Sequence, residues 1–217
     1  TITVVSIFVN PTQFNQSSDY ENYPRTIEED LHLLETLGVS AVFMPEEREM
    51  YPDNAHYYVD ESVLSHQMEG QYRPGHFKGV LTIVMKVLLL SRATRAYFSE
   101  KDYQQLQLVQ GMVNAFFIET QIIACPFLRD MRGLALSSRN SRLTSSERQL
   151  AYQFVTCLRE STAATVAQKN LEQLGVQVDY VTDWQGRRFA AVWIGAVRLI
   201  DNIPIRDQPI VTQEGVY

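Results

Sequence analysis

Three polar segments of the sequence carry side chains that could bind an anionic substrate and stabilise charge during a reaction. The first, Asn10-Pro11-Thr12-Gln13-Phe14, holds two amide side chains that can donate to and accept from a polar ligand. The second runs from Ser99 to Gln105 and places Lys101 where a predicted helix begins, a position whose backbone amides and dipole favour an anion. The third runs from Arg129 to Asn140, where two serine hydroxyls beside Arg139 can hold phosphate oxygens. Arg139 could also neutralise charge on a leaving group.

Each segment also has a structural interpretation that the residues alone leave open. The Asn10 segment could be an Asx or proline turn that ends a strand. The Ser99 segment could be an ordinary helix cap with solvated charges, although Asp102 and Gln105 lie three residues apart and share a helical face. The Arg129 segment could be a polar interdomain linker.

A fourth segment, Arg73 to Gly79, precedes a predicted helix and carries three potential cations. Its histidine, His76, could contact a substrate, but a single histidine is more often a structural hydrogen-bonding residue. The other histidines, His32, His56 and His66, show no metal-ligand spacing with it, so we expect no metal site.

Composition narrows the class of protein. The 217 residues include 19 Lys and Arg against 25 Asp and Glu, a formal charge of −6, and 45% of them are apolar. This predicts a packed protein of one large domain, or one domain with a small appendage, and excludes disorder and a coiled coil. The acidity weighs against a nucleic-acid coat, because such binding needs basic surface.

Two further features concern the cellular setting. The most apolar stretch, Gly79 to Leu90, is interrupted by Lys86 and is shorter than the roughly 20 residues of a membrane span, so we expect no span. Cys125 and Cys157 form neither a disulfide framework nor a Cys-x-x-Cys pair, so we expect a reducing cytoplasm and no zinc or redox site.

The elements that must position these segments follow a strand, helix, strand order. Residues 2–9 predict a strand buried on both faces, Thr26 and Glu29 predict a capping box that opens a helix, and Gly38 is placed to end that helix in the left-handed conformation. The pattern then repeats; the further predictions are a strand at 39–44, a helix at 79–91, a strand at 96–98, a helix at 102–113 and a strand at 120–125. This order predicts a parallel α/β sheet, in which ligands bind beyond the carboxyl ends of the strands.

The pattern changes near Asn140 to Thr144, which predicts a domain of residues 1–140 followed by a small α+β domain of residues 141–217. Thr144 and Glu147 predict a second capping box, with a helix to about Glu160. A short helix at 170–174 and two antiparallel strands, 176–182 and 189–199, complete the expected C-terminal domain.

Six motifs occur in the order of one family and cover nearly the whole chain. They are NPTQF at Asn10, YPRT at Tyr23, RPGHFKGVLTIV at Arg73, EKDYQQL at Glu100, GLALSSRN at Gly133 and RLIDN at Arg198. The chain thereby closely resembles the pantothenate synthetases, ATP-dependent ligases that join pantoate to β-alanine. The resemblance implies a Rossmann-like nucleotidylyltransferase domain with a small lid-like C-terminal domain, a homodimer, and a reaction through pantoyl adenylate that releases pyrophosphate and then AMP, with ATP and Mg²⁺ required.

The resemblance also implies roles for individual residues. Lys101 and Arg139 are the expected catalytic residues. The expected contacts to pantoate or β-alanine come from Asn10, Gln13, Arg73, His76 and Gln105. The expected contacts to ATP come from Ser99, Glu100, Lys101, Asp102, Leu128, Leu136, Ser137, Ser138 and Arg139, with Leu128 on the adenine side.

Departures from the family pattern lead to further expectations. The family carries a first strand and a P-T-M-G-x-L-H-x-G-H segment with the catalytic histidine, and the printed sequence has neither. A polypeptide starting at Thr1 is therefore expected to be inactive, and we hypothesise that the sequence omits residues, which an intact mass equal to 24.9 kDa would contradict. Ser99 replaces the usual glycine before EKD, residues 159–183 are shorter than in the family, and residues 206–217 have no counterpart.

Two alternatives to the enzyme remain open at this point. One is a non-catalytic remnant that only binds ligands or forms dimers. The other is an adenylyltransferase that activates a different carboxylic acid, although Gln13 and Gln105 both match the pantoate pattern.

Overall fold

The computed structural model describes residues 2–15, 17–21 and 23–205, and it divides into two compact units. The first comprises Thr1–Ala96 and Gln107–Ile122, and the second comprises Tyr97–Leu106 and Ile123–Tyr217. The predicted division into a domain of residues 1–140 and a domain of residues 141–217 stays a prediction. Part of the expected C-terminal domain, residues 206–217, lies outside the described residues, as does Thr1.

The chain is a mixed α/β structure. Its elements in the first unit are β1 (Val4–Ser6), η1 (Pro11–Gln13), α1 (Ser17–Glu21), α2 (Ile27–Thr36), β2 (Ala41–Phe43), α3 (Glu47–Met50), η2 (Leu64–His66), α4 (Glu69–Tyr72) and α5 (His76–Ser91). The division between the units passes through β3 (Arg95–Ser99), α6 (Tyr103–Ala115) and β4 (Gln121–Cys125). The second unit holds η3 (Glu100–Asp102), η4 (Ser138–Arg142), α7 (Ser145–Glu160), α8 (Ala164–Gln173), β5 (Gln177–Trp184), β6 (Arg187–Ile194) and β7 (Val197–Pro204).

The predicted strand, helix, strand order is confirmed at the start of the chain. β1 and β2 pair in parallel with Val4 opposite Ala41, and α2 lies between them in sequence. The strand predicted at 2–9 is only Val4–Ser6, and its burial on both faces is wrong, because Val4 is 51% exposed and Ile2, which precedes the strand, is 81% exposed. Among the described residues β2 is the only strand that pairs with β1, so its other edge is not covered by the sheet.

The predicted capping box before α2 is also wrong. Thr26 has φ −116° and ψ 50°, outside the extended geometry of a capping residue, and its hydroxyl donates to Asp30 Oδ1 at 3.2 Å instead. No residue of α2 is buried, and Leu37, which caps its C-terminal end, is 68% exposed. Gly38 does adopt the predicted left-handed conformation, with φ 71°.

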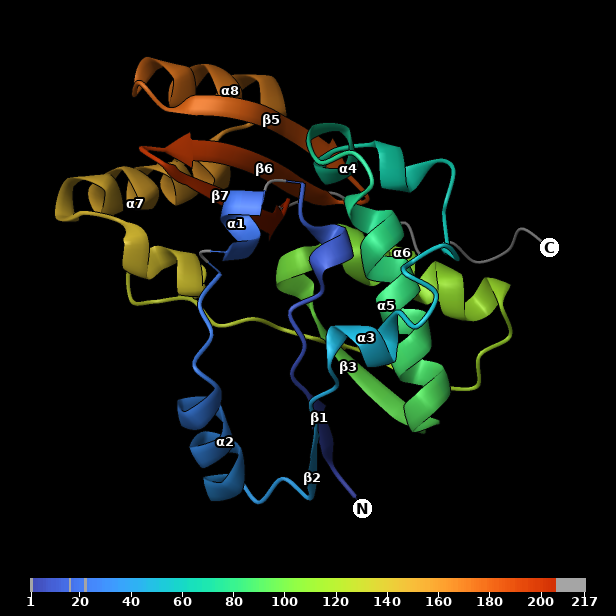
Figure 1. Cartoon of the computed structure of the whole chain (residues 1–217). Helices are drawn as coiled ribbons and strands as arrows, with labels where there is room; N and C mark the ends of the chain where they lie inside the picture. Colours follow the sequence, from blue (N-terminus) through green and yellow to red (C-terminus); the bar gives the residue numbers. More distant parts are fainter. Residues whose placement is uncertain (1, 16, 22, 206–217) are drawn as a thin grey trace. The chain divides into compact units, whose positions relative to one another are not determined.

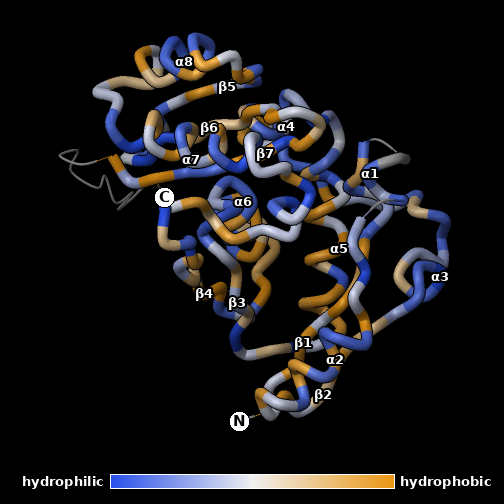
Figure 2. The backbone as a smooth tube through the Cα atoms, turned by 90° about the vertical axis from the view of Figure 1, so that its left-hand side faces the viewer, coloured by the Kyte–Doolittle hydropathy of each residue, from blue (hydrophilic) through white to orange (hydrophobic). Residues whose placement is uncertain are grey.

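Helix α5 is strongly hydrophobic, and Figure 2 shows apolar residues along most of its length. It begins three residues earlier than predicted, because Gly75 adopts φ 80° and turns the chain into the helix. Ile83 of α5 packs with Met50 and Tyr51 in a small core, joined by the partly buried Phe8, Phe43, Ala55, Val84 and Val87. Within the described residues, no helix combines the length and the hydrophobicity needed to cross a bilayer.

The second unit contains the main antiparallel sheet, in the order β5, β6, β7. Helix α8 packs against β5, and α7 packs against β6 and β7 (Figure 1). Their shared core includes Phe154, Leu158 and Leu171, each fully buried. The predicted capping box is confirmed, since the Thr144 hydroxyl accepts from the Glu147 amide and the Glu147 carboxylate accepts from the Thr144 amide.

Two element predictions in this unit need correction. The single strand expected at 189–199 is two strands, because Gly195 adopts φ 58° and allows a tight turn between β6 and β7. The helix expected at 170–174 begins at Ala164, and its capping residue Ala163 has no side chain that could have signalled the start.

Candidate active site

Asn10 holds the NPTQF turn through a side-chain amide whose nitrogen and oxygen each make two hydrogen bonds. It is 2% exposed, and its Nδ2 donates to the Gly79 carbonyl at 3.2 Å and to Gln13 Oε1 at 3.3 Å. Its Oδ1 accepts from Tyr51 at 2.7 Å and from Thr12 at 3.0 Å. A contact between Asn10 and substrate remains a prediction. In this structure its amide orients Gln13.

The turn η1 lies unusually close to α5. A Cβ atom added to Gly79 would stand 2.6 Å from the Thr12 carbonyl oxygen and 2.8 Å from the Gln13 nitrogen. Real Cβ atoms are not found that close to backbone, so only glycine permits this approach. The glycine at this helix position therefore places Gln13 directly against the start of α5.

Arg73 and His76 both bind the backbone of Gln13. The His76 Nδ1 lies 2.9 Å from the Gln13 carbonyl oxygen, and Arg73 Nη2 donates to the same oxygen at 3.4 Å. A carbonyl only accepts, so His76 carries its proton on Nδ1, and its Nε2 can accept from Arg73 Nη1 at 3.2 Å. Arg73 also faces the buried Glu69 at 3.8 Å. This geometry supports a positioning role for His76.

Tyr51 completes this cluster, and sequence reasoning missed it. Its hydroxyl donates to Asn10 Oδ1 and lies 3.1 Å from the Thr12 hydroxyl. Burial raises the pKa of Tyr51 above its ordinary value, so the phenol stays protonated and able to donate. Its position 41 residues after Asn10 gave no pattern that links the two.

Ser99 begins the second set of site residues, which belongs to the second unit. Its hydroxyl accepts from the Lys101 amide at 3.1 Å, so the predicted helix cap is present. The short turn η3 then leads into α6, whose N-terminus carries Gln105 in its first turn. The Lys101 ammonium makes no hydrogen bond or ion pair with any other residue that the structure describes, which leaves it available for an anion.

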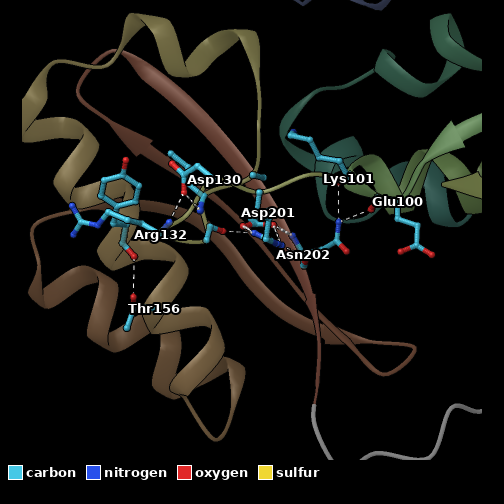
Figure 3. Close-up of polar contacts among 12 residues, drawn as sticks. Glu100, Lys101, Asp130, Arg132, Thr156, Asp201 and Asn202 are labelled. Atoms are coloured by element: carbon cyan, nitrogen blue, oxygen red, sulfur yellow. Dashed lines mark hydrogen bonds and ion pairs between the residues drawn. The ribbon is translucent and has the colours of Figure 1, made fainter. Parts of the chain in front are cut away.

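Asn202 on β7 fixes the backbone of this turn. It is 2% exposed, and its Nδ2 donates to the Glu100 carbonyl at 2.9 Å and to the Lys101 carbonyl at 2.8 Å. Its Oδ1 accepts from Arg187 Nε at 2.7 Å. Figure 3 shows the Asn202 amide directed at both carbonyls, while the Lys101 side chain extends away from it.

Asp201, the preceding residue, binds Arg129 in the segment 129–140, the other segment predicted to hold phosphate oxygens. Its carboxylate accepts two hydrogen bonds from Arg129, both at 2.7 Å, and is 3% exposed. Arg129 also donates to the Gly133 carbonyl at 2.9 Å and to the Asn202 carbonyl at 3.1 Å. Asp130 tightens the same loop by accepting from two backbone amides at 3.0 Å, those of Arg132 and Leu134.

Arg187 on β6 adds charge behind the Glu100 turn. Its guanidinium lies 3.9 Å from the Glu100 carboxylate and 4.6 Å from the centre of the Tyr103 ring. Burial lowers the pKa of Arg187 from its ordinary value, and the Glu100 carboxylate opposes that shift. Tyr103 in turn packs on Phe189, with ring centroids 6.0 Å apart.

The SSRN segment forms a second capped turn. The Ser137 hydroxyl accepts from the Arg139 amide at 3.3 Å at the start of η4. Ser138 and Leu136 are exposed, Leu128 is 74% exposed, and the backbone amide of Leu136 donates to the Leu128 carbonyl at 3.0 Å. Ser138 is therefore accessible to a ligand.

The structure brings the predicted residues together in two sets. The first unit unites Asn10, Gln13, Arg73 and His76, and the second unit unites residues 99–105 with residues 128–139 through β7. Sequence reasoning missed Asp201, Asn202 and Arg187 as site residues. The only signal was the RLIDN motif, to which it assigned no role. Among the described residues no cluster of His, Cys, Asp or Glu could hold a metal ion by itself.

Comparison with known sequences points to one family. The family model for pantoate-beta-alanine ligase matches residues 1–204. A pantothenate synthetase of Legionella pneumophila (strain Corby) is 54% identical over 200 residues, which are 92% of this chain and 79% of that protein. A pantothenate synthetase of Coxiella burnetii (strain Dugway 5J108-111) is 50% identical over 204 residues, covering 94% of this chain and 79% of that protein.

Solved structures agree. The crystal structure of a pantoate-beta-alanine ligase from Francisella tularensis, complexed with beta-gamma ATP and beta-alanine, matches with a TM-score of 0.89 and 40% identity. It covers 94% of this chain and 79% of that one. The pantothenate synthetase of Thermus thermophilus matches with a TM-score of 0.86 and 37% identity over 94% of this chain and 83% of that one. The predicted nucleotidylyltransferase-type α/β fold is confirmed by these matches.

Proposed function

Because this chain belongs to the pantoate-beta-alanine ligase family, we propose that it joins pantoate to β-alanine at the expense of ATP. The observation that carries the proposal is the family match over residues 1–204, which includes every segment of the two residue sets. The same match favours an enzyme over a non-catalytic remnant. An ATP-bound and β-alanine-bound relative supports the choice of substrates.

The reaction takes place in two steps. A pantoate carboxylate oxygen attacks the α-phosphorus of ATP, and the bond to the bridging oxygen breaks to release pyrophosphate and leave pantoyl adenylate. The β-alanine amine then attacks the acyl carbon, and AMP leaves as the amide forms and the amine loses a proton. Negative charge develops on the phosphate oxygens in the first step, so cations placed there lower the barrier.

We assign the site residues of the second unit, apart from Gln105, to ATP. Lys101, with no partner for its ammonium among the described residues, and Arg139 stabilise the phosphates, while Ser137 and Ser138 donate hydroxyl hydrogen bonds. The backbone at Ser99 and Glu100 and the Asp102 side chain line the same turn. Leu128, on the adenine side, and Leu136 are both exposed, at 74% and 52%.

We assign the amide groups to pantoate. Gln13, held by Asn10 and by Arg73 and His76, presents a neutral amide suited to the hydroxyl groups of pantoate. Gln105 in the first turn of α6 supplies the second amide.

Magnesium enters this proposal as part of the substrate, Mg-ATP. An ion bound to phosphate oxygens needs only one or two protein carboxylates, so the donor set of this chain fits such an ion without a dedicated cage. Asp102 is the carboxylate of the Lys101 turn that could share it. When bound, the ion would neutralise phosphate charge alongside Lys101 and Arg139.

The test is pantoate-dependent exchange between pyrophosphate and ATP, with magnesium and without β-alanine, on the full-length protein. We expect exchange in the parent protein, a large loss in Lys101→Ala, and no loss in Lys169→Ala, which removes an exposed lysine of α8. Exchange supported equally by unrelated carboxylic acids would favour the alternative adenylyltransferase. Absence of exchange with every acid would refute the proposal.

We further propose a homodimer in the cytoplasm. Both are what the resemblance to the pantothenate synthetases implies, and the two cysteines, which are free thiols, are consistent with a reducing compartment. Sedimentation equilibrium measures the first, and fractionation of cells measures the second.

A further inference from the structure

Two consecutive residues of β7 bind the two segments that we assign to ATP. Asp201 binds Arg129, the first residue of the segment 129–140, which we call the SSRN loop after its last four residues. Asn202 binds the carbonyls of Glu100 and Lys101. Both side chains are nearly fully buried, at 3% and 2% exposed. A single strand therefore connects segments that are separate in the sequence (Figure 3).

The Asn202 amide matches its surroundings atom by atom. Its NH₂ group has two hydrogens and two carbonyl acceptors, at 2.9 and 2.8 Å, and its oxygen accepts from Arg187. Because the two acceptors are the Glu100 and Lys101 carbonyls, the amide fixes the orientation of both peptide groups that flank the Lys101 Cα atom. Neither an aspartate nor a leucine of similar size could make the same contacts, since both lack the donors.

The Asn202 contact restricts the backbone of Lys101. That backbone is held at two points: its amide donates to the Ser99 hydroxyl, and its carbonyl accepts from Asn202. Its side chain is a flexible four-carbon stem with no protein partner among the described residues, so backbone position is what limits where the ammonium can go.

We propose that Asn202 is a positioning residue for Lys101 and that Asp201, through Arg129, positions the SSRN loop, so that β7 sets the spacing of both phosphate-binding segments. The proposal rests on the proposed function for its catalytic consequence. Because Asn202 is 2% exposed and its amide atoms are taken up by protein partners, it acts by holding the Lys101 backbone. Small misplacements of a catalytic group can cost about a hundredfold in rate, so the effect on turnover is large.

The experiment compares Asn202→Ala, Lys101→Ala and the double variant in the full-length protein, with Asp179→Asn as the matched control. Asp179 accepts from Arg198 at 2.7 Å in the same sheet, so its replacement disturbs a comparable contact away from the turn. Two readouts are used. The first is the kcat and KM of pantoate-dependent exchange, and the second is amide hydrogen exchange of the peptide that covers residues 99–105.

We expect Asn202→Ala to lower kcat by about tenfold to a hundredfold while the KM for pantoate stays unchanged. In the Lys101→Ala background the same change should cost nothing further, because a residue that acts through Lys101 has nothing left to position. Residues 99–105 should exchange faster, and Asp179→Asn should leave both readouts unchanged.

The proposal is overturned if Asn202→Ala keeps the parent kcat and exchange pattern, or if its effect multiplies with that of Lys101→Ala. Should Asn202→Ala fail to fold, Asn202→Ser, which can donate to one carbonyl, should show a smaller loss of the same kind. If the parent protein shows no pantoate-dependent exchange, the proposed function fails, and hydrogen exchange at 99–105 alone then supports or overturns the positioning contact.

Discussion

The Tyr51 hydroxyl donates a 2.7 Å hydrogen bond to Asn10 Oδ1 and thereby links the end of α3 to the NPTQF turn. The bond is buried, and it fills one of the two acceptor positions of an amide that also holds Gln13. The orientation of Gln13 consequently depends on a tyrosine that lies outside all six motifs.

Replacing Tyr51 with Phe should weaken this arrangement in a measurable way. The variant loses a hydrogen bond and leaves Asn10 with one acceptor position unused, so the free energy of unfolding should fall by about 1 kcal/mol. The KM for pantoate in the exchange assay should rise while the KM for ATP stays unchanged, because the Tyr51 hydroxyl contacts Asn10 and Thr12 of the turn that holds Gln13. Equal changes in both constants would contradict this assignment.

Gly79→Ala should damage the same site by a different route. The new methyl would meet the Thr12 carbonyl at 2.6 Å and push η1 away from α5, so we expect a raised KM for pantoate and a loss of about 1–3 kcal/mol in the free energy of unfolding. Steady-state kinetics and urea denaturation measure the two effects.

Gly111→Ala is the matched control for that variant. Gly111 lies within α6, and a Cβ there meets nothing within 4 Å. Since alanine is the better helix former, this change should raise the free energy of unfolding by about 0.5–1 kcal/mol and leave the kinetics as they are. Similar destabilisation by both substitutions would show that the close approach at Gly79 is not the cause.

Asp201→Ala should be strongly destabilising. It leaves the Arg129 guanidinium without its bidentate partner beside a largely buried strand, so we expect a loss of about 3 kcal/mol in urea denaturation. Arg48→Ala removes an exposed ion pair with Glu46 and should cost less than about 1 kcal/mol. A loss at Asp201 as small as the one at Arg48 would contradict the prediction.

The capping box of α7 predicts a dependence of stability on pH. The backbone amide of Thr144 lowers the pKa of Glu147 below its ordinary value of 4.5, and the Thr144 hydroxyl adds to the shift. A lowered folded-state pKa contributes stability above pH 4.5 that is lost as the pH falls through the folded value.

Glu147→Gln should therefore be less stable than the parent at neutral pH, and the difference should shrink as the pH falls below 4.5. Urea denaturation at a series of pH values measures it. A difference between the two proteins that does not change with pH would mean that the charge of Glu147 plays no part in the cap.

Local signals in the sequence predicted much of the fold. The Thr144 and Glu147 box, the left-handed Gly38 and the helix at Ser145–Glu160 are each set by residues within a few positions of one another. The predictions failed where contacts between distant parts of the chain determine the structure. The burial of β1 depends on neighbours that no local pattern reveals, and the turn at Gly195 breaks what is otherwise one continuous apolar run.

The candidate site divides in the same way. The Ser99 cap was predictable, because a cap at a helix start is visible in the sequence itself, while the roles of Lys101 and Arg139 stay predictions. Tyr51 and Asn202 were not, since each acts on a residue far away in the chain and looks like an ordinary polar residue in its own segment.

The contact between Asn202 and Glu100 spans 102 residues of sequence. Contacts of that separation must close a long loop before they contribute stability. During synthesis the ribosome makes the Lys101 turn well before it makes β7, whose last residue is Pro204. The turn therefore acquires its final geometry only after nearly the whole described chain has been synthesised, and catalytic competence should be among the last properties to appear on folding.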